Sequence, residues 1–385
     1  MLTEEPESTN SLEQPLAVRR PTRRRYIIFI ILAILLVAYG IFLIATSKHV
    51  PASSQQPTAS SQAVASGVHK PYLTGLLNRN GPPDASLLTY AGKPLITGFV
   101  IPVNWKDVQP NGPADFNTTL IDQQLAFARQ HNMGVRLRLY AGYNSPDWVK
   151  QQVGSVNWQG RPTEGGPSSY VIPDFWKAPF RDIWQAFNTK LAAQYDAEPI
   201  IRDVNSGMCI TNFDEPFIRQ FSVAQNVATA KANGYTDDTN NLCLQATIDT
   251  FKATWSKTSL SVTFNPFQSV STAPGDAIIE PKAIADYCVS QLGSHCVLGN
   301  DSLESNKRSD DYDNLYTMMH TTGAPLYIQT ATNARIGDWQ KTLADAVDIG
   351  ALDVELPVGY AMYDAAALQA FNARLQANTD HFNAK

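Results

Sequence analysis

Short apolar runs and longer amphipathic segments alternate along most of the chain beyond residue 90. The apolar runs have the length of strands and lie at 96–103, 134–140, 200–204, 260–264, 296–299, 325–330 and 351–356. Segments with apolar residues at helical spacing lie between or after them, at 117–132, 146–152, 175–195, 240–255, 281–292, 310–321, 338–349 and 364–376. This alternation is typical of a parallel α/β protein.

The number of strand–helix units favours a barrel over an open sheet. Seven strands are clear and a weaker one lies near 170–172. Eight units over about 290 residues fit a single (β/α)8 TIM barrel better than an open doubly wound sheet. No Gly-x-Gly-x-x-Gly or P-loop pattern is present, which argues against the nucleotide-binding α/β proteins.

The first 70 residues differ from the rest. Residues 26–46 are uncharged and mostly apolar, follow a cluster of arginines, and are long enough for a helix that crosses a bilayer. A cleaved signal peptide is the alternative, although its apolar region is usually shorter. Residues 1–21 are polar and mixed in charge, and the arginines before residue 26 predict a cytoplasmic N-terminus, so residues 1–25 are expected to form a disordered cytoplasmic tail. Residues 47–70, rich in Ser, Ala, Gln and Pro, predict a flexible linker to an extracellular domain at 71–385.

The charge of the chain argues against nucleic acid as a binding partner. The chain has a formal net charge of −5, so it lacks the basic footprint of a nucleic-acid-binding protein. The lipid bilayer, through residues 26–46, is one expected partner. No metal or organic cofactor is implied by any motif.

The four cysteines all fall in the predicted extracellular part, at Cys209, Cys243, Cys288 and Cys296. An even count in an oxidising compartment predicts two disulfides. Cys288 and Cys296 flank a short helix-to-strand link and are the first choice for a pair, which leaves Cys209 with Cys243. Four buried free thiols are the alternative. No Cys-x-x-Cys spacing suggests zinc.

The main chemical candidate is Glu215, in the sequence Asp214-Glu215-Pro216 after the strand at 200–204. In a barrel this carboxylate would stand near the mouth, where barrel active sites lie. A carboxyl group there could act as a general acid, and a mechanism that uses a pair of carboxyl groups would need a second one nearby. The alternative is structural: Asp214 would cap a helix that begins here, with Pro216 in its first turn.

Asp353 and Glu355 share one face of the last strand, whose other face is apolar. In a barrel they would point inward and need partners, which Arg136 and Arg138 on the strand at 134–140 can supply. Glu355 is therefore a candidate for the second catalytic carboxylate. A purely structural salt-bridge network is the alternative.

Residues at predicted strand ends could bind a sugar. Trp105, Tyr140 and Trp148 offer flat aromatic faces, and core packing is the alternative for each. Asn265 and Asn300 follow two later strands and could hydrogen-bond hydroxyl groups, although turn formation would also explain them.

Several of these segments resemble clan A glycoside hydrolases. The segment from Gly98 to Pro110, which reads GFVIPVNWKDVQP, resembles the first unit of such barrels. The sequence Ser145-Pro-Asp-Trp148 is similar to the Pro-x-Trp of family-42 and family-35 β-galactosidase-like enzymes. Asp214-Glu215-Pro216 resembles the Asn-Glu-Pro at the end of strand four, which implies that Glu215 is the general acid/base.

The resemblance also implies roles for other residues and shows two departures. Arg138 looks like the arginine that orients the nucleophile. Asp214 replaces the family's Asn, and Gln329 stands at the end of strand seven, where the family has its nucleophilic Glu. Glu355 is the nearest replacement, and Asp301 and Glu304 are further candidates.

Two hypotheses follow. The first is a membrane-anchored extracellular glycoside hydrolase acting on a cell-surface or environmental polysaccharide. Its catalytic residues would be Glu215 and Glu355, with Arg138, Asp214 and Gln329 among the substrate-binding residues. The second is a non-catalytic glycan-binding or scaffold barrel, which Gln329 favours.

Overall fold

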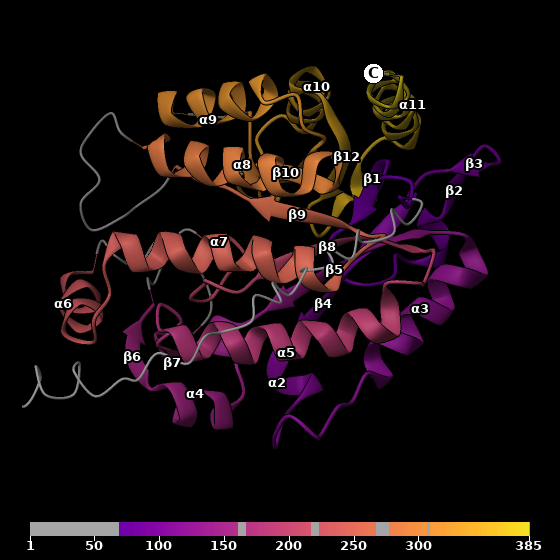
Figure 1. The fold of residues 1–385 in the computed structure, drawn as a ribbon. Coiled ribbons are helices and arrows are strands. Elements are labelled where there is room, and N and C mark those ends of the chain that lie inside the picture. The colour runs from indigo at the N-terminus through magenta and orange to yellow at the C-terminus, as the bar shows by residue number, and fades with distance from the viewer. Residues whose placement is uncertain (1–68, 161–166, 217–222, 267–276, 306–308, 385) are drawn as a thin grey trace, which may run out of the picture. The chain divides into compact units, whose positions relative to one another are not determined.

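The computed structural model describes residues 69–160, 167–216, 223–266, 277–305 and 309–384 (Figure 1). The predicted tail at 1–25, the predicted membrane span at 26–46 and almost all of the predicted linker lie outside these ranges. Within the described ranges, no helix combines the length and the apolar composition that crossing a bilayer requires.

Eight parallel strands close into one barrel in the order β1-β12-β11-β10-β9-β8-β5-β4. They are β1 Gly75–Asn78, β4 Gly98–Asn104, β5 Gly134–Tyr140, β8 Ile201–Gly207, β9 Ser259–Thr263, β10 Cys296–Leu303, β11 Leu326–Thr330 and β12 Ala351–Leu356. The barrel closes at β1, where Leu77 is paired with both Gly98 of β4 and Glu355 of β12. The predicted fold class, a TIM barrel, is confirmed.

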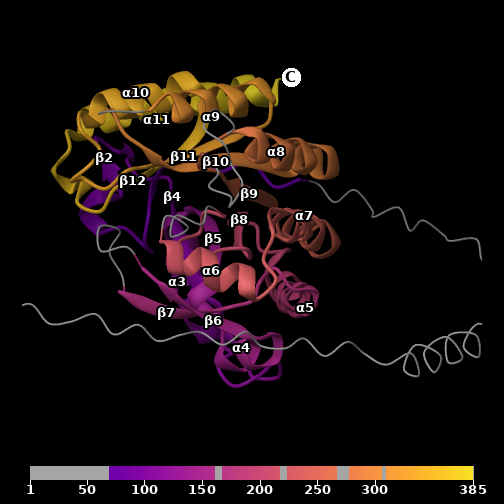
Figure 2. The same ribbon diagram turned by 90° about the vertical axis from the view of Figure 1, so that its left-hand side faces the viewer.

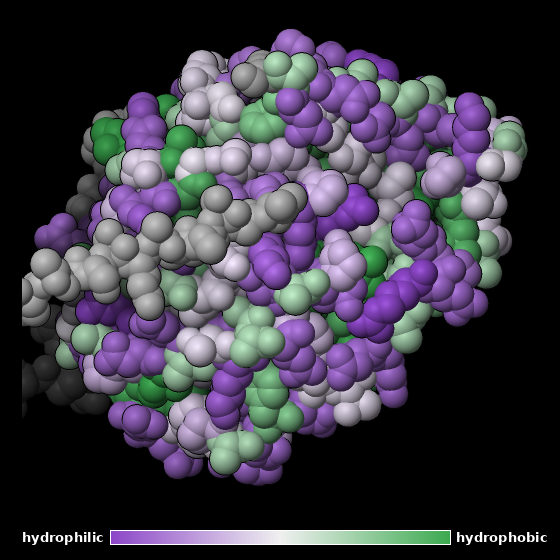
Figure 3. Space-filling model, turned by 45° about the vertical axis from the view of Figure 1, so that its right-hand side comes forward, coloured by the Kyte–Doolittle hydropathy of each residue, from purple (hydrophilic) through white to green (hydrophobic). Residues whose placement is uncertain are grey.

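Helices lie outside the ring of strands (Figure 2). They are α2 Trp105–Val108, α3 Thr119–His131, α4 Asp147–Val153, α5 Ala178–Tyr195, α6 Ala224–Ala232, α7 Asp237–Thr254, α8 Ile279–Leu292, α9 Asp310–Thr321, α10 Trp339–Ile349 and α11 Ala365–Asn383. Their apolar faces pack on the strands, as in α10, where Leu343, Ala346 and Val347 are buried. On the face drawn in Figure 3, hydrophilic residues predominate and apolar ones form small patches between them.

One barrel strand differs from the prediction. The weak candidate at 170–172 belongs to β7 (Ser169–Pro173), which pairs antiparallel with β6 (Ser155–Gln159) in a separate two-stranded sheet. The missing barrel strand is β1, whose four residues are too few to show a period. A hairpin of β2 (Thr89–Tyr90) and β3 (Lys93–Pro94) lies between β1 and β4, where a barrel unit normally has a helix.

This shift changes some strand positions and leaves others unchanged. The strand that precedes Trp105 is the second of the barrel and the strand that carries Arg138 is the third. β8 remains the fourth strand, β11 the seventh and β12 the eighth. Glu215 and Gln329 can therefore still be compared with the family's residues at the ends of strands four and seven.

Both predicted disulfides are present. Cys209 bonds to Cys243 with a Cα–Cα distance of 6.0 Å, and Cys288 bonds to Cys296 with a Cα–Cα distance of 5.8 Å. The first joins the segment that follows β8 to α7. Because that segment continues to Glu215, this disulfide helps to fix the chain beside the barrel mouth.

Candidate functional site

A buried ion cluster fills the barrel interior below its mouth. Arg136 is fully buried, and its Nε lies 2.8 Å from Asp203 Oδ1 while its Nη1 lies 2.6 Å from Glu355 Oε1. Both of its terminal nitrogens also donate to Asp353 at 3.1 Å. The predicted inward face of β12 and its pairing with arginines from 134–140 are therefore confirmed.

A tyrosine ring completes this cluster from β11. The Arg136 guanidinium lies 4.0 Å from the centre of the Tyr327 ring, a cation–π contact. The neighbouring strand makes room for the ring at Gly299, where an added Cβ would lie 1.9 Å from Tyr327 Cε1. A glycine is therefore required here for Tyr327 to lie across the barrel beside Arg136.

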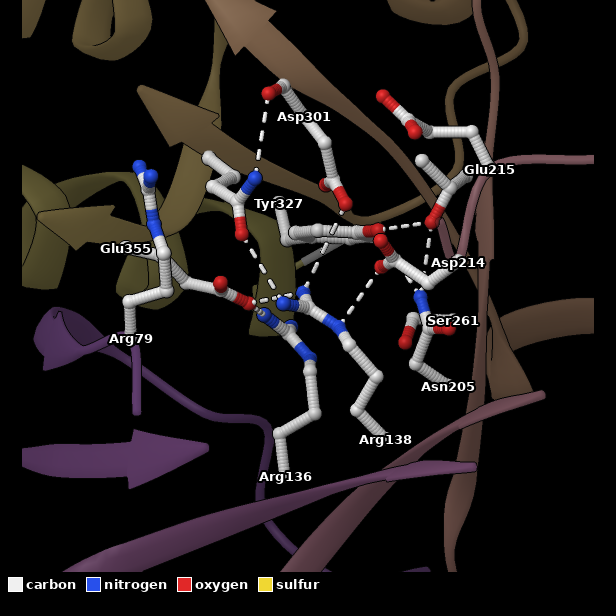
Figure 4. Close-up of polar contacts among 12 residues, drawn as sticks. Arg79, Arg136, Arg138, Asn205, Asp214, Glu215, Ser261, Asp301, Tyr327 and Glu355 are labelled. Carbon is white, nitrogen blue, oxygen red and sulfur yellow. Dashed lines mark hydrogen bonds and ion pairs between the residues drawn. The ribbon is translucent and has the colours of Figure 1, made fainter. Parts of the chain in front are cut away.

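Arg138 joins this cluster to the layer above it. Its Nη2 donates to Glu355 Oε1 at 2.7 Å, and its Nη1 donates to Gln329 Oε1 at 2.9 Å. Its Nε lies 2.7 Å from Asp214 Oδ2 in an ion pair. Figure 4 shows Arg138 at the centre of these contacts, with Asp214 and Glu355 on opposite sides. Arg138 thus connects the segment after β8 to β11 and β12.

A cleft of about 450 Å³ opens above Arg138. Its walls come from the carboxyl ends of the barrel strands, as in other TIM barrels. The lining residues are Arg79, Asn80, Arg138, Tyr140, Phe213, Asp214, Glu215, Asp301, Ser302, Gln329, Thr330, Ala331, Thr332 and Arg335. The structure thus brings together six of the predicted site residues, namely Arg138, Tyr140, Asp214, Glu215, Asp301 and Gln329.

Glu215 is buried and held by an amide. Asn265 Nδ2 donates to its Oε1 at 2.9 Å. Asn300 Nδ2 donates in turn to Asn265 Oδ1 at 3.0 Å, and Tyr316 donates to Asn300. The two asparagines, predicted to bind hydroxyl groups, therefore form a chain of hydrogen bonds that ends at Glu215. A donated N–H stabilises an ionised carboxylate, so this chain suits a charged Glu215.

The predicted helix does not begin at Asp214. Residues 211–216 form bends, and the next described helix, α6, begins at Ala224. Asp214 therefore does not cap a helix with Pro216 in its first turn, as the structural alternative expected. The Asp214 side chain points instead to Arg138, because an ion pair with a buried arginine satisfies a buried carboxylate.

Asp301, on β10, shares the cleft with Asp214. Burial raises the pKa of the Asp301 carboxyl well above its ordinary value, and the charge of Asp214 raises it further, while Arg138 opposes both effects. Arg138 Nη2 is 3.8 Å from Asp301 Oδ2, too far for a hydrogen bond. Both side-chain oxygens of Asp301 are buried without a hydrogen-bond partner. These surroundings favour the protonated form of Asp301.

Glu355 occupies a different position from the one a catalytic carboxylate needs. Its side chain is fully buried beneath Arg138 and does not line the cleft. Its Oε1 accepts from both Arg136 and Arg138. These contacts make Glu355 the counter-ion that holds two arginines in place, which is the salt-bridge alternative considered for β12.

The two predicted tryptophans lie away from the cleft. Trp105 is fully buried, packs against Trp148, Phe180, Trp184 and Phe187, and donates to Gln109 Oε1. Trp148 is partly buried, and its Nε1 donates to Gln109 O. Because both rings are used in packing between α2, α4 and α5, neither can contact a ligand in the cleft, and the predicted sugar-binding role does not fit them.

The sequence alone did not single out Arg79, which lines the cleft from the end of β1. It lies beyond a strand too short to be recognised, so no pattern placed it at the mouth. Within the described residues, no group of three His, Cys, Asp or Glu side chains is arranged to hold a metal ion.

Comparisons with known proteins bear on the fold. No family model matches the sequence, and no curated protein matches it. The catalytic domain of β-amylase from Paenibacillus polymyxa superposes with a TM-score of 0.52, covering 81% of this chain and 100% of that chain at 9% identity. The chain shares the fold of β-amylase. The resemblance to glycoside-hydrolase barrels is thereby confirmed for the fold.

Two further solved structures are similar. A β-galactosidase from the psychrophilic Marinomonas ef1 has a TM-score of 0.47 at 11% identity, covering 78% of this chain and 59% of that chain. Endo-glycoceramidase II from a Rhodococcus species has a TM-score of 0.45 at 12% identity, covering 76% of this chain and 75% of that chain.

The ion cluster predicts an unusual pH dependence of stability. Burial raises the pKa of Asp353 to about 7, against the lowering effect of Arg136. Between the unfolded pKa near 4 and this value, the folded chain binds more protons than the unfolded chain, so Asp353 makes the folded state less stable as the pH rises. We expect the free energy of unfolding of wild type, measured by urea denaturation, to fall relative to that of Asp353→Asn as the pH rises across this window.

The exposed Asp286, paired with Lys282 on α8, supplies the control. Its variant Asp286→Asn should differ from wild type by a small amount that does not depend on pH between 4 and 7. A difference between wild type and Asp353→Asn that stays constant over this range would contradict the assignment of Asp353.

Proposed function

We propose that this chain is a glycoside hydrolase whose reacting carboxyl groups are Asp301 and Glu215. The observation that carries the proposal is their convergence on one cleft at the barrel mouth, from β10 and from the segment after β8. Hydrolysis of an O-glycosidic bond needs two carboxyl groups in different protonation states. The surroundings of these two residues provide that difference.

The roles follow from those surroundings. Asp301 is buried beside Asp214, which favours its protonated form, so it is the group that protonates the leaving glycosidic oxygen. Glu215 accepts an N–H from Asn265, which stabilises its ionised form, so it supplies the second carboxylate. The family resemblance gives Glu215 the acid/base role. We assign proton donation to Asp301 because it lines the cleft and because burial and the charge of Asp214 raise its pKa.

Glu355 acts as a positioning residue in this proposal. It fixes Arg138, and Arg138 fixes Asp214 next to Asp301. Tyr140 also lines the cleft. Its hydroxyl is neutral, because burial raises the pKa of the phenol. It can therefore donate a hydrogen bond to a substrate hydroxyl at any physiological pH.

We also propose that the barrel lies outside the cell and is held there by a membrane span. Residues 26–46 support a single membrane span with the N-terminus in the cytoplasm, and the two disulfides support an oxidising compartment for the barrel. The substrate would then be a cell-surface or environmental polysaccharide. Protease added to intact cells should remove the barrel, and release of the chain from membranes by alkaline carbonate would contradict the span.

A glycan-binding barrel without turnover is the second candidate. Gln329 favours it, because an amide at the end of strand seven cannot act as an anionic nucleophile, and here it donates to Asp301 O and accepts from Arg138. In this case oligosaccharides would bind in the cleft but no reducing ends would be released.

The Asp301→Asn variant tests the assignment of the proton donor. An amide has no acidic proton to give, so we expect the release of reducing ends from polysaccharides to fall by about 10²–10⁴-fold. In wild type, activity should fall as the pH rises through the raised pKa of Asp301, because the ionised group can no longer donate. A variant that retains full activity and the same alkaline limb would contradict the role of Asp301.

A further inference from the structure

Two arginines line the cleft on the side opposite Glu215. Arg79 follows β1 and Arg335 follows β11, and these strands flank β12 in the barrel order. In a ring of eight strands, the strand opposite β12 is β8, which leads to Glu215. Figure 4 likewise shows Arg79 and Glu215 at opposite ends of the drawn cluster. The cleft therefore has a cationic wall facing a wall of carboxyl groups.

Arg79 lacks a carboxylate partner. Its Nη2 donates to the backbone oxygen and the hydroxyl of Thr330, and its Nε is buried without an acceptor. Among the described residues, no Asp or Glu lies within ion-pair distance of Arg79. Burial lowers the pKa of Arg79, the direction expected for a cation removed from water. A partly buried cation without an anion in contact with it is costly, and a bound anion would offset that cost.

Arg335 is the more available of the two cations. Its side chain is about half exposed, and its Nε lies 3.4 Å from Glu304 Oε2. An exposed ion pair of this length contributes little and can rearrange. Arg335 can therefore turn toward an anion that is held by Arg79.

We propose that the cleft selects a sugar bearing an anionic group, a carboxylate or an ester sulfate, which binds on the wall of Arg79 and Arg335. This inference rests on the proposed glycan-binding cleft and names the class of its substrate. Asp214 and Glu215 would repel an anion from the other wall. The acidic group therefore lies on the side of the sugar away from the bond that is cleaved.

A structural role for Arg79 makes a different prediction. Glu355, Asp301 and Asp214 all raise its pKa through their charges, so Arg79 could serve only to offset the buried carboxylates from a distance. In that case its loss would weaken binding of acidic and neutral sugars alike. If Arg79 binds the ligand directly, its loss should weaken binding of the acidic sugar only.

The experiment compares matched oligosaccharides by titration calorimetry with the full chain carrying Glu215→Gln, which prevents turnover during the measurement. The pairs are tetragalacturonate and its carboxyl-reduced form, a mannuronate tetrasaccharide and its carboxyl-reduced form, and a chondroitin 4-sulfate tetrasaccharide and its desulfated form. We expect the acidic member of at least one pair to bind about tenfold more tightly, from a hydrogen-bonded ion contact. The preferred pair separates carboxylate from sulfate recognition.

Variants identify the residue responsible. Arg79→Gln should abolish the preference for the acidic sugar while leaving the neutral sugar unchanged, and Arg79→Lys should retain part of it. Arg335→Gln, which alters a more exposed side chain, should reduce the preference even if Arg79→Gln fails to fold. Arg374→Gln is the matched control, because Arg374 on α11 pairs with Asp348 outside the cleft. Its preference should equal that of the parent.

The outcomes separate this inference from the proposed activity. Preferential binding of an acidic sugar without turnover in wild type would support the cationic wall and contradict the hydrolase. Turnover of neutral sugars only would support the hydrolase and overturn the cationic wall. Equal binding of the acidic and neutral members of every pair would also overturn the cationic wall. So would a preference for the acidic sugar that survives both Arg79→Gln and Arg335→Gln.

Discussion

Glu215→Gln should lose turnover by about 10²–10⁴-fold and still bind oligosaccharide. Glutamine keeps the size of the side chain, and its Oε1 can still accept the N–H of Asn265, which lies 2.9 Å from Glu215 Oε1 in wild type. The chain of hydrogen bonds to Asn300 therefore survives, and only the charge is removed. Release of reducing ends reports turnover, and calorimetry with the same oligosaccharide reports binding.

A matched substitution outside the cleft gives the control for this result. Glu198 lies just before β8 at the opposite end of the strand from Glu215, where it pairs with the exposed Arg129. Glu198→Gln should keep wild-type turnover. If Glu215→Gln retained full turnover, the mechanism would be wrong. If neither wild type nor the variant showed turnover but both bound the sugar equally, the glycan-binding alternative would replace the hydrolase.

Arg136→Met should destabilise the barrel by about 3–5 kcal/mol. Methionine has a similar length, but it leaves Asp203 and Asp353 without a cation and Glu355 with Arg138 alone. Buried carboxylates without a partner are ionised only at high cost, so they take up protons instead. The loss should therefore be largest near neutral pH and shrink toward pH 5, as measured by the urea midpoint.

The exposed pair of Arg129 and Glu198 provides the comparison. The Arg129 side chain is 52% exposed, so Arg129→Met should cost less than about 1 kcal/mol at every pH. A similarly small cost for Arg136→Met would contradict the view that the interior ion cluster holds the barrel together. So would a cost that does not change with pH.

Sequence patterns predicted most of the barrel because the strand–helix alternation repeats. The helix at Asp310–Thr321 and the strand at Ala351–Leu356 have the predicted bounds, since each has a clear period and a clear boundary. β1 was missed because Gly75–Asn78 is defined by its pairing with β12 and β4, not by any period of its own. β7 was placed in the barrel because a strand pattern does not reveal its partner.

The site was only partly predictable. Glu215 could be found because it follows a strand in a barrel, and the pairing of β12 carboxylates with arginines followed from alternation. The state of Asp301 could not be read from sequence, because it depends on burial in the cleft and on the charge of Asp214 beside it. Trp105 and Trp148 were misplaced because sequence position near a strand end does not say whether a ring turns toward the cleft or the core.

The disulfide pairing illustrates why local inferences succeed more readily than distant ones. Cys288 and Cys296 are separated by 8 residues and Cys209 and Cys243 by 34, so each pair closes a loop between neighbouring elements. Arg79 and Glu215 meet at one cleft only because the barrel closes. No local pattern contains that information.

The structure of Glu215→Gln crystallised with an oligosaccharide that wild type cleaves tests the central claim most directly. The account predicts a glycosidic oxygen within hydrogen-bond distance of the Asp301 carboxyl, with the side chain at position 215 on the other side of the same sugar. An oligosaccharide bound elsewhere on the surface, or one in the cleft with its glycosidic oxygens out of reach of Asp301, would contradict it.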